Sequence, residues 1–301
     1  MIMRTTLILR ILFFVSVAAF LPACAAEAVD DGKIQVVVTT SVLGDIVHRA
    51  VGAEASVVTI MPGGADPHEF EPSARQVAEI QSADLVIANG LGLEEGLEDV
   101  LAAVESDALF EFGLQVEPVP LGESGGSDPH VWLDPLRMVK ALDALTQHLE
   151  TIEASVDWHS TAAGYRSELI ETDEWIIDRL ASIPSADRIL VTGHDAFGYY
   201  ADRYGFEVVA TILPGATTMV EPSASGFAEV VAIVEASAAP AVFTDIGESP
   251  ALAEQLVQQV GREVLVITLY SGTISGNGSG PGDYVAMMRW NTEHIALVFE
   301  R

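Results

Sequence analysis

The chain is poor in cysteine and in basic residues. Of its 301 residues one is cysteine, 14 are lysine or arginine and 44 are aspartate or glutamate, so the formal net charge is −30. A single cysteine cannot form a disulfide within the chain. A surface this acidic repels phosphate groups, which argues against nucleic acids and anionic membranes as partners. Because the acidic residues are spread along the whole chain, we attribute most of the charge to the salt or proteome habit of the host.

The chain also lacks a long apolar segment at its start. Residues 11–21 are apolar but too short for an ordinary membrane-spanning helix. They follow two arginines and lead into Leu21-Pro22-Ala23-Cys24. A charged region, an apolar region and then small residues is the order found in a secretory signal peptide. These four residues resemble a bacterial lipobox, in which the cysteine becomes the lipidated first residue. We expect residues 1–23 to be a signal peptide, Cys24 to be lipidated and residues 24–32 to be a flexible tether; plain secretion is the alternative.

The rest of the chain contains an internal repeat, with a period of about 150 residues. A strand-like run at residues 36–41 leads into a helix that ends at Gly52, and residues 189–194 lead into one that ends at Gly205. Further matching pairs are residues 57–63 with 209–215, 71–74 with 221–224, and 84–89 with 241–245. Such self-similarity indicates two lobes of similar fold.

Each repeat alternates short β-branched runs with helical stretches, which is the pattern of βαβ units around a parallel sheet. Ser73 opens a capping box, and Asp134-Pro135 marks another helix start. Apolar residues at helical spacing from 156 to 183 predict one long helix, about 40 Å in length. We therefore predict an α/β fold of two similar lobes with mainly parallel sheets, joined by one long rigid helix, with the ligand site in the cleft between them. The predicted ranges are 33–154 for the first lobe, 155–184 for the linking helix and 185–301 for the second lobe.

Three histidines lie in loops near strand ends, each with an aspartate close by in sequence. They are His68 in Asp66-Pro67-His68, His130 in Asp128-Pro129-His130, and His194, which Asp195 follows. Neutral imidazole suits zinc and its neighbours in the transition series, and a nearby carboxylate can take the second ring N–H. Ligands of open α/β sheets bind beyond the carboxyl ends of the strands, so we expect the three histidines to converge on the cleft.

The plainer interpretation is that Asp-Pro starts a turn and that these histidines are surface residues. Two copies of the triplet within a repeated fold favour a shared metal site instead. The other four histidines fall in helical stretches, and we interpret them as surface or packing residues. They are His48, His148, His159 and His294.

Together these motifs resemble the zinc and manganese solute-binding proteins of bacterial ABC importers. The resemblance covers nearly all of the mature chain and rests on residues 61–63, 66–68 with 71–73, 128–135, 194–197 with 204–205, and 287–291. It implies an exported monomer, either a membrane-anchored lipoprotein or periplasmic, that delivers a divalent metal ion to its ABC permease. His68, His130 and His194 match the family's first three ligand positions. Members with histidine at the third position are mostly zinc proteins, so the resemblance implies Zn²⁺, with Mn²⁺ as the alternative.

Two features depart from the family pattern. The family's fourth ligand is often an aspartate, and here Gly272 takes its place. Asp245, where relatives usually carry glutamate, is the first substitute as a metal ligand, and Glu248, Asp283 or a water molecule are further candidates. Many zinc members also carry a His-rich loop before the second ligand motif, and residues 122–127 contain no histidine.

Other functions use the same residues. Three histidines around an open fourth position could form a zinc hydrolase, with Glu69 or Asp195 as the general base. A surface lipoprotein that acts as an adhesin or metal chaperone is a further alternative. Two lobes with metal ligands at their interface fit capture and release better than catalysis, because such proteins work by closing around a ligand. We therefore predict a binding protein and not an enzyme.

Overall fold

The computed structural model describes residues 32–121, 126–276 and 278–300. The predicted signal peptide, Cys24 and all but the last residue of the predicted tether lie outside the described residues. Lys33–Arg301 forms one compact unit. In the described ranges no helix combines the length and the apolar character needed to cross a membrane.

The first lobe contains a parallel sheet with the strand order β2-β1-β3-β4. Its strands are β1 (Ile34–Val38), β2 (Ala55–Thr59), β3 (Leu85–Ala88) and β4 (Leu109–Glu111). Its helices are α1 (Ser41–Val51), α2 (Ala74–Gln81), α3 (Glu98–Leu101) and α4 (Pro135–Ile152), with short 3₁₀ turns η1 (Glu95–Leu97), η2 (Phe112–Gln115) and η3 (Val131–Leu133). The sequence predicted the first three strands, and the structure adds β4.

The second lobe repeats this arrangement with the order β6-β5-β7-β8, again all parallel. Its strands are β5 (Ile189–Thr192), β6 (Glu207–Thr211), β7 (Ala241–Asp245) and β8 (Leu265–Leu269). Its helices are α6 (Gly198–Tyr204), α7 (Ala224–Ala236), α8 (Ala251–Gln259) and α9 (Tyr284–Phe299), preceded by the 3₁₀ turn η4 (Ser185–Asp187). The matching strand orders confirm the repeat that the sequence predicted.

The predicted linking helix is α5 (Trp158–Leu180), which spans 23 residues and so about 35 Å. Asp157 is its N-cap, whose side chain accepts a hydrogen bond from the backbone N–H of Ser160. Its buried face repeats every three or four residues, as in any helix packed along one side. The predicted lobe boundaries fall a few residues outside its two ends and remain predictions.

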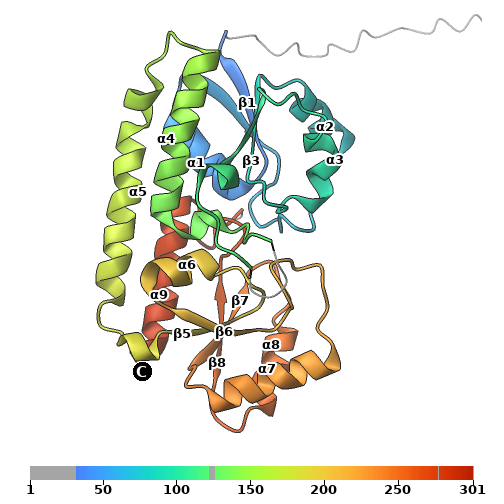
Figure 1. Ribbon diagram of the computed structural model, residues 1–301, viewed down its shortest axis with the longest axis vertical. Coiled ribbons are helices and arrows are strands. Elements are labelled where there is room, and N and C mark those ends of the chain that lie inside the picture. The colour runs from blue at the N-terminus through green and yellow to red at the C-terminus, as the bar shows by residue number, and fades with distance from the viewer. Residues whose placement is uncertain (1–31, 122–125, 277, 301) are drawn as a thin grey trace, which may run out of the picture. The chain divides into compact units, whose positions relative to one another are not determined.

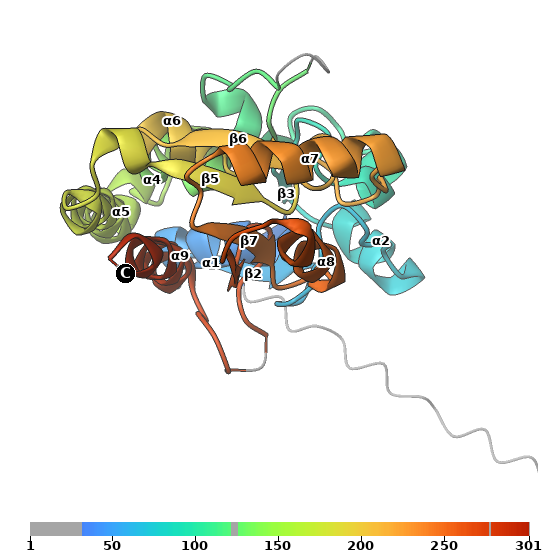
Figure 2. The same cartoon turned by 90° about the horizontal axis from the view of Figure 1, so that it is seen from below.

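One hydrophobic core runs through both lobes. Side chains of α1, α4, α5, α6 and α9 share it with one face of each sheet. The other face of the first sheet packs against α2 and α3, and that of the second sheet against α7 and α8. In β1, Val36 and Val38 point into the shared core and Val37 into the smaller one, because successive residues of a strand face opposite sides. Figures 1 and 2 show α5 and α9 on one side of the sheets and α2, α7 and α8 on the other.

Several helix ends follow the predicted local signals. Ser73 and Gln76 form the capping box of α2, and the Asp134 side chain accepts hydrogen bonds from the first backbone N–H groups of α4. Gly52 and Gly205 end α1 and α6 with φ of 55° and 69°, a backbone region that glycine adopts without steric cost. These ends fix where each strand-to-helix loop begins. The loops that carry the histidines lie beyond the carboxyl ends of the strands, as expected for this sheet type.

Candidate metal centre

The three predicted histidines meet in the interior between the lobes. Nε2 of His130 lies 3.3 Å from Nε2 of His68 and 3.3 Å from Nε2 of His194. The three side chains belong to buried residues, with His130 fully inaccessible. In the described part of the chain, they are the one group of three or more His, Cys, Asp or Glu residues whose ligand atoms all lie within 4.8 Å of one another. Nitrogens around tetrahedral zinc lie about 3.3–3.4 Å apart when Zn–N bonds are about 2.0–2.1 Å.

The two Asp-Pro-His triplets adopt the same local structure. Oδ1 of Asp66 accepts the backbone N–H of His68 at 2.9 Å, and Oδ1 of Asp128 accepts that of His130 at 2.9 Å. Each triplet is therefore an Asx turn, in which the aspartate side chain replaces a backbone acceptor. Asp-Pro does start a turn here, and that turn carries the histidine to the buried centre. The surface interpretation of these two histidines was wrong.

Carboxylates hold the outer ring nitrogen of two histidines. Nδ1 of His130 lies 2.8 Å from Oδ1 of Asp128, and Nδ1 of His194 lies 2.7 Å from Oε1 of Glu248. A proton on Nδ1 directed at the carboxylate leaves Nε2 as an electron-pair donor toward the centre. The sequence suggested Asp128 through its position beside His130. The sequence offered Glu248 only as a candidate metal ligand and gave no sign that it holds the ring of His194, which lies 54 positions away.

Burial sets the charge of this cluster. Burial lowers the pKa of His68 to about 4, and the charge of His194 acts in the same direction. Burial also lowers the pKa of His130 well below its usual range. For His194 burial acts downward, but the hydrogen bond and charge of Glu248, with further acids, outweigh it, so its pKa is raised. Two of the three imidazoles are therefore neutral at pH 7 and available as ligands.

Asp128 responds to the same burial. Its pKa is raised to about 8, because burial disfavours the carboxylate and the nearby charge of Asp195 adds to this. A divalent cation at the Nε2 atoms would favour the ionised form and strengthen the acceptor of the His130 Nδ1–H. The charge of this pair therefore depends on the occupant of the centre.

The loop that carries His130 is braced by buried neighbours. The side-chain N–H of Asn89, at the end of β3, donates to the carbonyl of Pro129 at 2.8 Å. The indole of Trp132 packs edge-on against the His130 ring, with centroids 5.3 Å apart, and its N–H donates to the carbonyl of Ser271 at 2.6 Å. These contacts tie a loop of the first lobe to one of the second beside the histidines.

Asp245 lies next to this centre but is otherwise engaged. One carboxylate oxygen accepts the backbone N–H of Gly247 at 3.0 Å, and the other accepts the N–H and hydroxyl of Ser271. Among the described residues no carboxylate oxygen joins the group of three ring nitrogens. Asp245 and Gly272 nevertheless border a cavity of about 10 Å³ together with His68 and His194. A cavity of this size accommodates about one water molecule.

The other candidates have clear places. Glu248 binds His194 through Nδ1, as described above. Asp283 caps α9, where its Oδ1 accepts the backbone N–H of Ala286 at 2.7 Å, and it also faces Arg49. The four remaining histidines lie in helices α1, α4, α5 and α9, as predicted.

The family described as zinc-uptake complex component A, periplasmic, matches residues 36–298 through its sequence model. The chain belongs to this family. The predicted resemblance is therefore confirmed, and the protein is a metal-binding component of an uptake system and not an enzyme. The zinc hydrolase alternative was wrong.

Individual relatives differ in the metal of their names. The chain is 30% identical over 290 residues to the manganese-binding lipoprotein MntA of Halalkalibacterium halodurans, a match that covers 93% of this chain and 95% of that protein. It is 29% identical to the zinc-binding protein TroA of Treponema pallidum, covering 91% of this chain and 92% of that protein. A solved structure of that periplasmic zinc-binding protein matches with a TM-score of 0.83 and 28% identity, covering 90% of this chain and all of the other.

Proposed function

We propose that this protein captures one zinc ion through His68, His130 and His194 and delivers it to an ABC permease. The observation that carries the proposal is the convergence of three buried histidines, with Nε2 of His130 lying 3.3 Å from Nε2 of each of the other two. When His130 and His194 are neutral and their Nδ1–H groups point at Asp128 and Glu248, both Nε2 atoms present electron pairs and cannot donate hydrogen bonds to one another. Buried electron pairs that face each other need a shared cation, which is a proton on His194 at low pH, where its raised pKa favours the charged form, or a metal ion.

The choice of zinc follows from the ligand atoms. Imidazole nitrogen suits zinc and its neighbours, whereas manganese prefers carboxylate, carbonyl and water oxygens. The group of converging ligand atoms contains nitrogen only. The relatives named above include both a manganese-binding and a zinc-binding protein, and manganese is the alternative cargo.

Metal analysis of the purified protein, followed by competition titration, tests this choice. We expect zinc in the purified protein and a wide gap between its zinc and manganese affinities. Most sites bind zinc more tightly than manganese, so the gap needs a reference. The Gly272→Asp variant supplies it, because it adds a carboxylate beside the centre and should raise manganese affinity more than zinc affinity. Bound manganese in protein purified from medium that contains both metals would contradict the proposal.

The fourth ligand is proposed to come from Asp245. Its carboxylate borders the small cavity beside His68 and His194. To reach a metal, an oxygen must leave the N–H and hydroxyl of Ser271 that it now accepts. Such a carboxylate would give each lobe two ligands and help to hold the lobes together around the ion. Water is the alternative, because the cavity is large enough for one molecule.

A pair of variants separates these alternatives. If Asp245 ligates, Asp245→Ala should lower zinc affinity more than about tenfold, whereas Ser271→Ala, which removes one of the two hydrogen bonds to the same carboxylate oxygen, should not weaken binding. If Asp245 only supports the loop, both variants should weaken binding slightly and equally. Titration against a competing chelator measures both. Unchanged affinity in Asp245→Ala would leave a three-histidine site completed by water.

We further propose that the protein works outside the cytoplasm as a monomer, anchored through an acylated Cys24 once residues 1–23 are removed. The support is the signal-like start of the chain and its membership of a periplasmic uptake family. Stable anchoring requires more than one acyl chain. The mass of protein extracted from membranes should therefore correspond to an acylated chain that begins at Cys24, and an unmodified soluble form would contradict this.

A further inference from the structure

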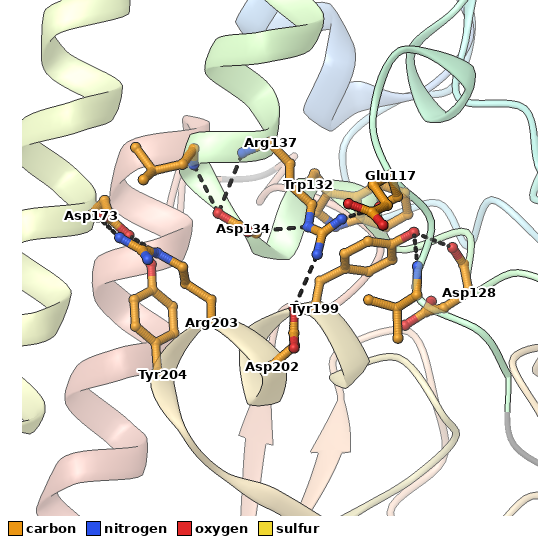
Figure 3. Close-up of polar contacts among 12 residues, drawn as sticks. Glu117, Asp128, Trp132, Asp134, Arg137, Asp173, Tyr199, Asp202, Arg203 and Tyr204 are labelled. Atoms are coloured by element: carbon orange, nitrogen blue, oxygen red, sulfur yellow. Dashed lines mark hydrogen bonds and ion pairs between the residues drawn. The ribbon is translucent and has the colours of Figure 1, made fainter.

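The segment that precedes His130 contains an interrupted backbone pair. The N–H of Asp128 donates to the carbonyl of Val119 at 2.8 Å, next to the antiparallel bridge between Pro120 and Ser127. In a regular pair the N–H of Val119 would donate back to the carbonyl of Asp128. Here the hydroxyl of Tyr199 stands between the two groups. It accepts the N–H of Val119 at 3.2 Å and donates to the carbonyl of Asp128 at 2.9 Å (Figure 3).

Tyr199 comes from the opposite lobe. It lies on α6, five positions after His194, and its side chain is fully buried. Its hydroxyl therefore connects α6, which follows His194, to Asp128, which holds the ring of His130. The approach is close, because a Cβ added to the neighbouring Gly198 would lie 2.5 Å from Oδ2 of Asp128.

Arg137 fixes the ring from its other side. Its guanidinium lies 4.7 Å from the ring centroid of Tyr199, the geometry of a cation–π contact. The same guanidinium donates to Asp134 at 3.2 Å, to Asp202 of α6 at 3.0 Å and to the carbonyl of Glu117 (Figure 3). The tyrosine is thus held by polar contacts at its hydroxyl and by a charged group over its ring.

We propose that Tyr199 is a positioning residue for His130, acting through Asp128. This inference rests on the proposed function, since it assigns the residue a role in metal binding. The hydroxyl fixes the backbone of Asp128, the Asp128 carboxylate fixes the ring of His130 through Nδ1, and the ring directs Nε2 to the centre. Without the hydroxyl, the N–H of Val119 and the carbonyl of Asp128 either stay unpaired or move together to form a direct hydrogen bond. Forming that bond would move Asp128, and with it His130.

The test compares two tyrosines of the same helix. Tyr200 is also fully buried, and its hydroxyl contacts Thr292 at 3.0 Å, which is not among the residues of the centre. Tyr199→Phe and Tyr200→Phe therefore remove the same atom from similar surroundings. Loss of groups that orient a metal-bound histidine lowers affinity about 10–100-fold; because Tyr199 acts one step further out, we expect a loss of about three- to tenfold in Tyr199→Phe and none in Tyr200→Phe. Zinc release to a chelator should accelerate by the same factor.

Two further measurements separate positioning from general stability. Asp128→Asn should lower zinc affinity about 10–100-fold, and adding Tyr199→Phe to it should cost little more, because both act on one chain of contacts. Visible absorption of the Co²⁺-loaded protein should change in Tyr199→Phe and not in Tyr200→Phe, since it reports ligand geometry. Gly198→Ala is a second route to the same effect, because the added methyl group displaces Asp128 while alanine favours the helix.

The outcomes separate the two proposals. Equal zinc affinities and equal Co²⁺ spectra in the two Tyr→Phe variants would overturn the role of Tyr199 while leaving the metal site intact. Additive losses in the Asp128→Asn double variant would overturn the route through Asp128. Wild-type zinc affinity in His130→Ala would instead overturn the proposed metal site itself.

Discussion

Replacing His68, His130 or His194 by alanine should lower zinc affinity at least about a hundredfold. Apparent binding free energies of structural zinc sites are about 10–16 kcal/mol, so each of three imidazoles carries several kcal/mol. The loss should be measured by competition with a chelator of known zinc affinity, at neutral pH or above. The three variants should be similar, because each histidine offers one ligand atom to the same compact group.

The matched controls are histidines on helices. His159 lies exposed on α5, and His294 on α9 stacks on Trp290 with centroids 4.3 Å apart. Alanine at either position removes an imidazole without touching the centre, so zinc affinity should stay within about twofold of the wild type. Comparable losses in the controls and the three site variants would show that the metal lies elsewhere.

Zinc affinity should fall steeply as the pH is lowered. The metal needs a neutral His194, and its raised pKa means that protons compete already above pH 6.5, its ordinary value. Asp128 has a pKa of about 8 in the metal-free protein and releases its proton when the cation favours the carboxylate, so that metal binding releases a second proton from the protein. Affinity should therefore drop between about tenfold and about a hundredfold for each pH unit. His68, with its pKa lowered to about 4, adds a further proton only below that pH.

Chelator competition between about pH 5 and pH 8 checks this profile. Glu248→Gln removes the charge that raises the pKa of His194. The zinc affinity of this variant should therefore begin to fall at a lower pH than that of the wild type. Asp128→Asn removes one titrating group, so its profile should be less steep by one proton. An affinity that does not change over this range would contradict the assignment of His194 as a ligand.

Much of the fold could be predicted because its signals are local. The sequence patterns that mark these elements depend on neighbours a few positions away. They are the short β-branched runs of the strands, the capping box at Ser73 and the glycines after α1 and α6. The repeat adds a second copy of each signal, which is why the equal strand orders could be expected. The short β4 strand, of three residues, was not predicted, because so few residues carry no clear period.

The metal centre, too, could be predicted only where its signals are local. The sequence placed His68, His130 and His194 in strand-end loops, and the Asp-Pro-His triplets made their turns predictable. It did not show that Glu248 holds His194 or that Asp245 binds Ser271. Those partners lie 54 and 26 positions apart, and no local rule relates them.

The sequence by itself determined the two α/β lobes, the turns that carry the histidines and the types of atom they offer. These follow from backbone preferences and turn chemistry, which act over a few residues. Tertiary structure alone decided the common core through α4, α5 and α9, the 3.3 Å distances from Nε2 of His130 to the other two Nε2 atoms, and the place of Tyr199 between two backbone groups. Such contacts arise only when segments distant in sequence pack against each other. Local backbone preferences do not distinguish between possible contact partners of a side chain, whereas burial and close packing do.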